Sequence, residues 1–358
     1  MSLQDLVDAE FAVETTYLNT ASIGVPPART LEAIRAAHEE WARGRASARA
    51  YDAVVAAARE SFARLVGTGP ERVAIGTTAS TEVGLVAGSL PAGAEVVMPE
   101  DDFSSLIQPF AGRDDLALRL VPLDDVADAV RPGTALVAVS AAQSADGRVA
   151  DLAAIRAAAS AHETLTLIDA TQALGWMELR ADEWDYVVCN TYKWLLCPRG
   201  VSFLVVSPRG AELMRPAYAG WYAGDDPWEN CYGPVRLADD ARRFDASPIW
   251  MAFVGAVQSL GLVEEIGIAR IGAHDLALAE RFRAGLTALG YEPVAGDSAI
   301  VAVPGLGHVA DRLDAADVKV AVRAGGLRAS FHLHNTIRDV DRTLDVLAGA
   351  VVGQHVRQ

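Results

Sequence analysis

Short apolar runs alternate with longer alanine-rich segments up to about residue 210, and this alternation constrains the fold more than any other feature of the sequence. The runs have the length and composition of buried strands and cover residues 72–76, 94–99, 135–140, 165–169, 185–190 and 201–206. Segments with helical spacing, such as 80–90 and 151–162, lie between most of them. Strands that alternate with helices predict an α/β fold built on a mainly parallel sheet.

The pattern changes near residue 250. Two long helical segments, roughly 250–264 and 273–289, precede short strand-like runs in 298–303 and 327–333, and a last helical segment closes the chain. We therefore predict a large domain over residues 1–248 and a smaller C-terminal α+β domain over residues 249–358.

The charge balance argues against two classes of partner. The chain carries 31 Lys and Arg against 47 Asp and Glu, a formal net charge of −16, which repels nucleic acids and anionic membrane surfaces. The sequence shows no signal-peptide pattern and no run of membrane-spanning length, so we expect a cytoplasmic protein. Its cysteines, Cys189, Cys197 and Cys231, have neither disulfide nor zinc spacing, and no metal is expected.

Lysine is rare in this chain. Lys193, in the stretch NTYKWLLC, is one of only two lysines. The other, Lys319, lies where a polar segment becomes apolar, and a solvated strand end explains it. Arginine holds its proton too tightly to act as an amine nucleophile, whereas the pKa of a lysine can be shifted by its surroundings. We therefore expect Lys193 to have a chemical role.

Polar residues stand at the ends of three predicted strands, where ligands of parallel sheets gather. They are Asp169 and Gln172 after one strand, Asn190, Tyr192 and Lys193 after the next, and Thr77, Thr78 and Ser80 before a helix. Pyridoxal phosphate needs such a set: an amine for its aldehyde, a carboxylate for its ring nitrogen and donors at a helix start for its phosphate. Each residue alone is more often a helix cap or a surface charge, so the prediction depends on their joint spacing.

These segments resemble the class V aminotransferase family of pyridoxal-phosphate enzymes, fold type I, which includes cysteine desulfurases, kynureninases and isopenicillin-N-epimerase-like proteins. The most specific motifs are IDATQALG (168–175) and CNTYKWLLCPRG (189–200). Further similar segments are YLNTASIGVPP (17–27), IGTTASTEVGL (75–85), DDFSSLIQPF (101–110), SAAQSADGRVADL (140–152), AGWYAG (219–224), RRFDASP (242–248) and LRASFHLHNTIRDVD (327–341).

The resemblance implies a role for each matched residue around the cofactor ring. Lys193 would form the Schiff base, Asp169 would hold the ring nitrogen, and Gln172 would lie near the phenolic oxygen. Phe103 would stack on the ring, with Gln143 in polar contact. Without the resemblance, core packing would explain Phe103.

Further cofactor contacts implied by the resemblance are Thr78, Ala79, Asn190, Tyr192 and Trp221. Ser247 would reach the phosphate of the neighbouring subunit, which implies a homodimer with shared active sites. Asn19, in an N-terminal segment (1–25) near the active site, and Arg328, in a bidentate pair, would bind the substrate carboxylate. Core packing for Trp221 and a surface ion pair for Arg328 are the alternatives.

The sequence leaves the reaction open. The loop that carries the sulfur-accepting cysteine of cysteine desulfurases has no room before Arg328, which disfavours persulfide chemistry, and Cys231 is expected to be ordinary. Transamination of a small α-amino acid needs no catalytic residue beyond Lys193 and is the preferred reaction. A β-lyase, such as a C–S lyase, and an epimerase are the alternatives. His332 or His334 could supply the acid for β-cleavage, although capping of a strand end explains them better.

Other classes of protein are disfavoured. The sequence contains no GxGxxG, GxxxxGK[ST] or GxSxG motif. A cofactor-less scaffold with the same fold is the alternative of another class, but such a protein would have no chemical reason to keep Lys193.

Overall fold

The structure is a computed structural model that describes residues 3–229 and 231–355. The ends of the two predicted domains, residues 1–2 and 356–358, lie outside the described residues.

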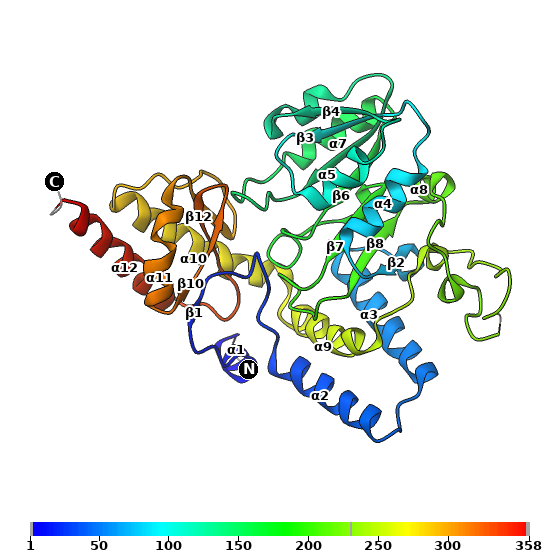
Figure 1. The fold of residues 1–358 in the computed structure, drawn as a ribbon, viewed down its shortest axis with the longest axis horizontal. Helices are drawn as coiled ribbons and strands as arrows, with labels where there is room; N and C mark the ends of the chain where they lie inside the picture. The colour runs from blue at the N-terminus through cyan, green and yellow to red at the C-terminus, as the bar shows by residue number, and fades with distance from the viewer. Residues whose placement is uncertain (1–2, 230, 356–358) are drawn as a thin grey trace.

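Seven strands form the central sheet in the order β2-β8-β7-β6-β5-β3-β4 (Figure 1). Their bounds are β2 (Val73–Gly76), β3 (Glu95–Pro99), β4 (Ala117–Val121), β5 (Thr134–Ser140), β6 (Leu165–Asp169), β7 (Tyr186–Asn190) and β8 (Ser202–Val206). Within this sheet only β8 runs antiparallel to its neighbours. The six predicted strands are confirmed with ends that shift by one residue at most. Strand β4 was not predicted, because it is a half-exposed edge strand and Arg119 interrupts its apolar run.

Side chains of the strands alternate between two hydrophobic clusters, because successive residues of a strand point to opposite faces. In β5, Val137 and Val139 join one cluster, and Leu136 and Ala138 join the other. Helices cover both faces. Their bounds are α1 (Leu3–Glu10), α2 (Ala28–Ala42), α3 (Tyr51–Leu65), α4 (Ala79–Ser89), α5 (Ser104–Ala111), α6 (Val126–Ala129), α7 (Leu152–Ala161) and α8 (Pro208–Leu213).

The C-terminal part forms a smaller α+β unit around a third hydrophobic cluster. Helix α9 (Trp250–Ile266) leads into this unit, but its buried side chains belong to the cluster that contains Val137 and Val139. The elements of the unit are α10 (Ile268–Ala288), β9 (Ile300–Val303), α11 (Ala310–Ala315), β10 (Val318–Lys319), β11 (Ala321–Arg323), β12 (Gly326–Ser330) and α12 (Ile337–His355). Strands β11, β12 and β9 form an antiparallel sheet in that order. The predicted fold class is confirmed. The boundary at Pro248 stays a prediction, because α9 packs against α2 and α3 beside the large sheet.

The N-terminal segment returns to this C-terminal unit. Strand β1 (Thr16–Tyr17) pairs in parallel with β10, and Figure 1 shows the two side by side. Leu18, fully buried, belongs to the third cluster. The N-terminal segment and the C-terminal unit therefore pack together.

No single helix within the described residues is long and apolar enough to cross a membrane. Only α9 and α10 taken together reach that length and composition, and the chain bends by 81° between them.

A buried ion pair holds β2, the strand that leads into residues 77 and 78. Asp245 is 1% exposed, and its carboxylate accepts hydrogen bonds from Arg59 Nη2 at 2.6 Å and from the Ile75 N–H at 2.9 Å. Arg59, on α3, also donates to the carbonyl oxygen of Val73. One carboxylate thus connects α3, β2 and the segment before α9.

We expect Asp245→Ala to lower the free energy of unfolding by about 3 to 5 kcal/mol, because it leaves the buried Arg59 charge unpaired. The control is Asp341→Ala, which removes an ion pair with Arg281 whose side chains are about half exposed. That change should cost less than about 1 kcal/mol. Urea unfolding of both variants measures the difference, and equal losses would contradict the assignment.

Candidate active site

The carboxyl ends of five strands meet at one edge of the central sheet, because β2, β3, β5, β6 and β7 run in the same direction. Residues that follow these ends line a cavity of about 130 Å³. They are Thr78, Ser80, Phe103, Ser105, Ser140, Ser144, Asp169, Thr171, Gln172, Asn190, Tyr192, Lys193 and Arg199. Eight of them are residues that the sequence predicted for the site: Thr78, Ser80, Phe103, Asp169, Gln172, Asn190, Tyr192 and Lys193.

Lys193 lies in this cavity and is 6% exposed. Its Nζ is 5.6 Å from the centroid of the Phe103 ring and 5.8 Å from that of the Tyr192 ring. Burial lowers the pKa of Lys193 to about 8, while the nearby Asp169 carboxylate opposes the shift and the Arg328 charge adds to it. Part of the amine is therefore unprotonated, and nucleophilic, close to neutral pH.

The two lysines should titrate separately. In the apo protein, grown with lysine labelled with ¹⁵N at Nζ, we expect one resonance to titrate near pH 8 and to disappear in Lys193→Ala. The Lys319 resonance should titrate above the usual lysine pKa of 10.5, because the Asp314 carboxylate raises its pKa. Asp169→Asn should lower the Lys193 pKa further, since it removes the attraction. Two resonances that both titrate above pH 10 would contradict this picture.

Asp169, at the end of β6, is 5% exposed. Its Oδ1 accepts the N–H of Thr171 at 2.8 Å. Burial raises the pKa of Asp169, and the Thr171 hydrogen bonds partly offset that effect. A partner with a positive charge or an N–H group would favour the ionised form.

The side-chain amide of Gln172 is hydrogen-bonded to other groups of the protein. Its Nε2 donates to the carbonyl oxygen of Ala21 at 3.0 Å and to Ser144 Oγ at 2.9 Å. Its Oε1 accepts the indole N–H of Trp194 at 3.0 Å. Gln172 thus links the end of β6 to the lysine loop, and its contact with a phenolic oxygen stays a prediction.

The N-terminal segment packs directly on the lysine loop. The N–H of Gly24 donates to the Tyr192 carbonyl at 2.9 Å. A Cβ at position 24 would lie 2.1 Å from the Lys193 carbonyl oxygen, so only glycine allows this approach. Asn19 bridges to Ser330, and its Oδ1 is buried without a hydrogen-bond partner among the described residues.

Arg328, on β12, is 1% exposed, so the surface ion pair considered for it is wrong. Its Nη1 donates to the carbonyl oxygen of Ser144 at 2.5 Å and its Nη2 to Ser22 Oγ at 2.8 Å. Its Nε has no partner within the described part of the chain. Because Ser144 lines the cavity, the guanidinium stands directly behind the cavity wall.

Residues 77–80 connect β2 to the first turn of α4. The Thr78 hydroxyl lies 3.2 Å from Ser80 Oγ. The N–H of Ala79 donates to Asn190 Oδ1 at 3.1 Å, so Asn190 joins β7 to the start of α4. The hydroxyls of Thr78 and Ser80 face the cavity at this helix start, which favours an anion there.

Residues 17–343 match the family model described as aminotransferase class-V. The chain belongs to the class V aminotransferase family.

Relatives of this class V family member carry several names. It is 26% identical over 315 residues to an uncharacterized aminotransferase, YcbU, of Bacillus subtilis (strain 168), with 82% of this chain and 83% of the relative covered. The cysteine desulfurase of Thermococcus onnurineus NA1 has the same fold, with a TM-score of 0.87 and 21% identity over 99% of both chains. A C-DES K223A mutant, solved with glycine covalently linked to the PLP cofactor, aligns with a TM-score of 0.86 and 22% identity over 94% of this chain and 97% of that one.

Pyridoxal phosphate is the cofactor of this class V enzyme, and the cavity fits it. Lys193 supplies an amine with a lowered pKa and Asp169 a buried carboxylate. Thr78 and Ser80 supply hydroxyls at a helix start. Phe103 is 47% exposed and lines the cavity, so core packing does not explain it.

Six residues of this site were not predicted: Asp102, Ser105, Ser140, Ser144, Thr171 and Arg199. Asp102, 6% exposed, accepts hydrogen bonds from the Ser140 N–H at 2.8 Å and from Gln143 Nε2 at 3.1 Å, which fixes the predicted residue Gln143 behind the cavity. Ser144 and Arg199 line the cavity, and Arg199 Cζ lies 4.6 Å from the centroid of the Tyr192 ring. The rule applied to the ends of β6 and β7 would have found Asp102, Ser140 and Ser144 if it had been extended to β3 and β5.

Trp221 and Ser247 are not among the described residues that line this cavity. Trp221 is half-buried and packs edge-on against Tyr222 and Trp228. Ser247 is exposed. Their roles at a phosphate stay predictions.

His332, His334 and Cys231 also lie outside the described lining of the cavity. The Nε2 of His334 bonds to the Tyr17 carbonyl, and burial lowers the pKa of His334 to about 4. The thiol of Cys231 faces the Pro227 carbonyl at 3.0 Å. His332 is fully buried, with Nδ1 2.8 Å from Asp275 Oδ2 and Nε2 3.0 Å from the Trp194 carbonyl oxygen.

Both ring nitrogens of His332 face oxygen atoms, so the pair must hold enough protons for two hydrogen bonds. Burial lowers the pKa of His332 to about 3 and raises that of Asp275 well above its usual range. A neutral imidazole that donates from Nε2, with a protonated Asp275 that donates to Nδ1, meets both requirements. Burial of both groups thus favours a neutral pair that supports Trp194 over an ion pair.

Asp275→Asn should change the free energy of unfolding by less than about 1 kcal/mol, because the amide can donate to Nδ1 as a protonated carboxyl does. Asp275→Ala should cost about 1 to 3 kcal/mol, since it leaves a buried nitrogen without a partner. Thermal or urea unfolding of both variants tests this. A loss of about 3 to 5 kcal/mol in Asp275→Asn would indicate an ion pair instead.

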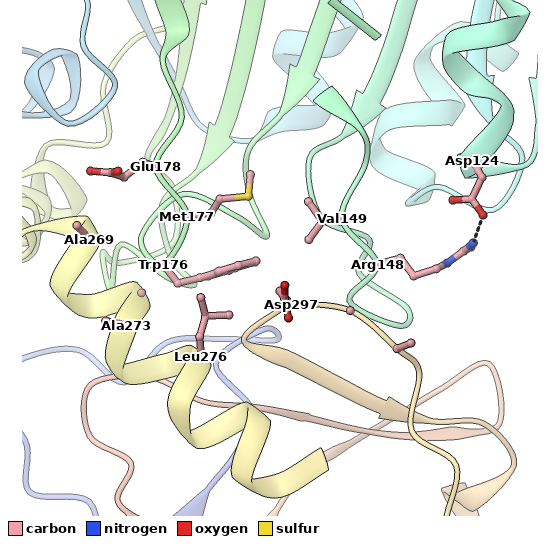
Figure 2. Close-up of a pocket in the computed structure, with 13 residues that line it drawn as sticks. Asp124, Arg148, Val149, Trp176, Met177, Glu178, Ala269, Ala273, Leu276 and Asp297 are labelled. Atoms are coloured by element: carbon pink, nitrogen blue, oxygen red, sulfur yellow. Dashed lines mark ion pairs between the residues drawn. The ribbon is translucent and has the colours of Figure 1, made fainter. Parts of the chain in front are cut away.

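A second cavity, of about 770 Å³, lies between α10 and the loops of the large sheet. Figure 2 shows Trp176, Met177 and Leu276 around it, with Arg148 paired to Asp124 at 3.9 Å. Its described lining contains no lysine, whereas the lining of the smaller cavity contains Lys193. The described residues also contain no cluster of His, Cys, Asp and Glu that could hold a metal ion.

Proposed function

We propose that this enzyme is an aminotransferase that acts on a small α-amino acid. The observation that carries the proposal is the set of titratable groups in the cavity. Among its described lining residues these are Asp169, Tyr192, Lys193 and Arg199, without a histidine or a cysteine. Lys193, whose pKa is lowered to about 8, is the one best suited to take up and release a proton near neutral pH.

The chemistry that pyridoxal phosphate supplies when bound is electron withdrawal from the α-carbon of an amino acid. Lys193 Nζ would remove the proton from the α-carbon of the substrate and deliver it to C4′ of the cofactor. The Asp169 carboxylate would favour a protonated ring nitrogen, and Phe103 would cover the ring face. Arg328 would hold the substrate carboxylate in register with Lys193. With these roles, transamination needs no proton-transfer residue other than Lys193.

The other reactions open to the family have less support. A β-lyase benefits from an acid at the leaving group, and the two histidines considered for that role are buried elsewhere. Persulfide chemistry needs an accessible thiolate. Burial raises the pKa of Cys189 well above its usual range and that of Cys197 to about 12, so both thiols stay protonated. Epimerisation would use the same lysine and is separated from transamination by the assay below.

The proposal includes a cytoplasmic homodimer in which Ser247 serves the phosphate site of the neighbouring subunit. It is supported by the position of Ser247, which is exposed and stands outside the described lining of its own cavity. Sedimentation velocity of the holoenzyme tests the dimer. In Ser247→Ala, weaker binding of pyridoxal phosphate with the dimer intact would support the shared site.

The reaction is tested by incubating the holoenzyme with candidate amino acids, with and without an α-keto acid. A transaminase forms a new keto acid only when the second substrate is present. Lys193→Ala should reduce the rate by at least roughly a hundredfold, because the proton carrier is lost. Lys319→Ala removes a half-buried lysine that lies outside the described lining of the cavity and should leave the rate unchanged.

Borohydride reduction gives a second readout. The cofactor should become fixed to Lys193 in the wild type and in Lys319→Ala, and to neither lysine in Lys193→Ala. Keto acid with ammonia or sulfide, formed without a second substrate, would identify a lyase, and inversion at the α-carbon an epimerase. Either result would overturn the aminotransferase proposal while keeping Lys193 as the proton carrier.

A further inference from the structure

The hairpin of β11 and β12 presents two arginines on one face. Its two-residue turn, Ala324 and Gly325, has φ values of 46° and 75°, as a type I′ turn requires. Arg323 pairs with Gly326, and Ala321 pairs with Arg328. Paired residues share a face and alternate residues return to it, so Arg323 and Arg328 lie on the same face.

The two guanidinium groups meet at a single hydroxyl of the N-terminal segment. Ser22 Oγ accepts a hydrogen bond from Arg328 Nη2 at 2.8 Å and another from Arg323 Nη2 at 3.2 Å. Burial, and then the Arg323 charge, lower the pKa of Arg328 to about 10. The two positive charges are therefore close enough to disfavour each other.

No acidic side chain within the described residues forms an ion pair with Arg323 or Arg328, although the chain has 47 Asp and Glu. The buried Arg59, by contrast, is paired with Asp245. The Nε of the buried Arg328 also has no partner. Two adjacent cations and an unused buried donor are what a ligand with more than one anionic group would satisfy.

We infer that Arg323 binds a second anionic group on the substrate, so that the enzyme selects α-amino acids with an acidic side chain. The inference rests on the proposed function, in which Arg328 takes the α-carboxylate. Arg328 is buried and bonded to the cavity residue Ser144, whereas Arg323 is exposed at the end of the hairpin. The deeper arginine is thus placed for the group next to the reacting carbon, and the outer one for the far end of the side chain.

Other residues of the cavity lining offer a second place for an anion. Thr78 and Ser80 stand at the start of α4, and Arg199 lies over the Tyr192 ring. A phosphate there leaves the Arg323 and Arg328 pair for the substrate. The two anion sites therefore do not compete for one ligand group.

The test compares acidic amino acids with their amides in the holoenzyme. The probes are L-aspartate with L-asparagine, and L-glutamate with L-glutamine. We expect the wild type to favour at least one acid over its amide in kcat/KM by roughly tenfold or more, the size of one lost charge-assisted hydrogen bond. Arg323→Gln should bring that ratio close to one by weakening the acid alone, and Arg323→Lys should restore part of it.

Arg281→Gln is the matched control, because it removes an arginine of the same C-terminal unit that pairs with Asp341 on the surface. It should leave the acid-to-amide ratio unchanged. The visible spectrum of each variant, titrated with the same probes, reports binding without turnover and shows whether the cofactor site is intact.

Equal treatment of acid and amide by the wild type, or an unchanged ratio in Arg323→Gln, would overturn the inference alone. A holoenzyme whose spectrum responds to none of the four probes nor to neutral amino acids such as L-alanine would overturn the proposed function as well. A response to L-alanine without one to the acidic probes would overturn only the role of Arg323.

Discussion

The burial of Trp194 is the constraint on which the site depends. Its indole N–H bonds to Gln172 at the end of β6, and its carbonyl accepts from His332 just beyond β12. The ring packs edge-on against both Trp176 and His332. One fully buried residue therefore joins the large sheet to the C-terminal unit. Because Lys193 precedes it directly, the reactive amine takes its position from both parts of the molecule.

The site contains several positive charges although the chain as a whole is strongly negative. The protein has a formal net charge of −16, yet Lys193, Arg199, Arg323 and Arg328 gather in or behind the cavity edge. The Asp169 carboxylate is the acidic group in the described lining. Burial and the Arg328 and Arg323 charges lower the pKa of Lys193, and the same positive charges attract anionic ligands. A phosphate-bearing cofactor and a carboxylate-bearing substrate are both favoured by that arrangement.

The most regular features of the chain were the easiest to predict. The strands of the large sheet are continuous apolar runs because both of their faces are covered, and the ends of β6 and β7 identified Asp169 and Lys193. Asp102 and Ser144 follow the ends of β3 and β5 in the same way. Both are common residue types in this chain, so nothing in the sequence distinguished them. The resemblance supplied Arg328, whose burial no local pattern indicated. The domain boundary and the parts of Trp221 and Ser247 at a phosphate stay predictions.

Local sequence patterns were enough to predict the α/β fold and to select Lys193 as the candidate reactive amine. Strand and helix periodicity is a property of neighbouring residues, and between lysine and arginine only lysine can become an amine nucleophile. Only the tertiary structure decided the protonation and the partners of the site. His332 and Asp275 are 57 residues apart, and Ser22 is 301 and 306 residues from the two arginines it joins. Burial and contact between such distant segments set each pKa, because desolvation depends on what the whole fold places around a group.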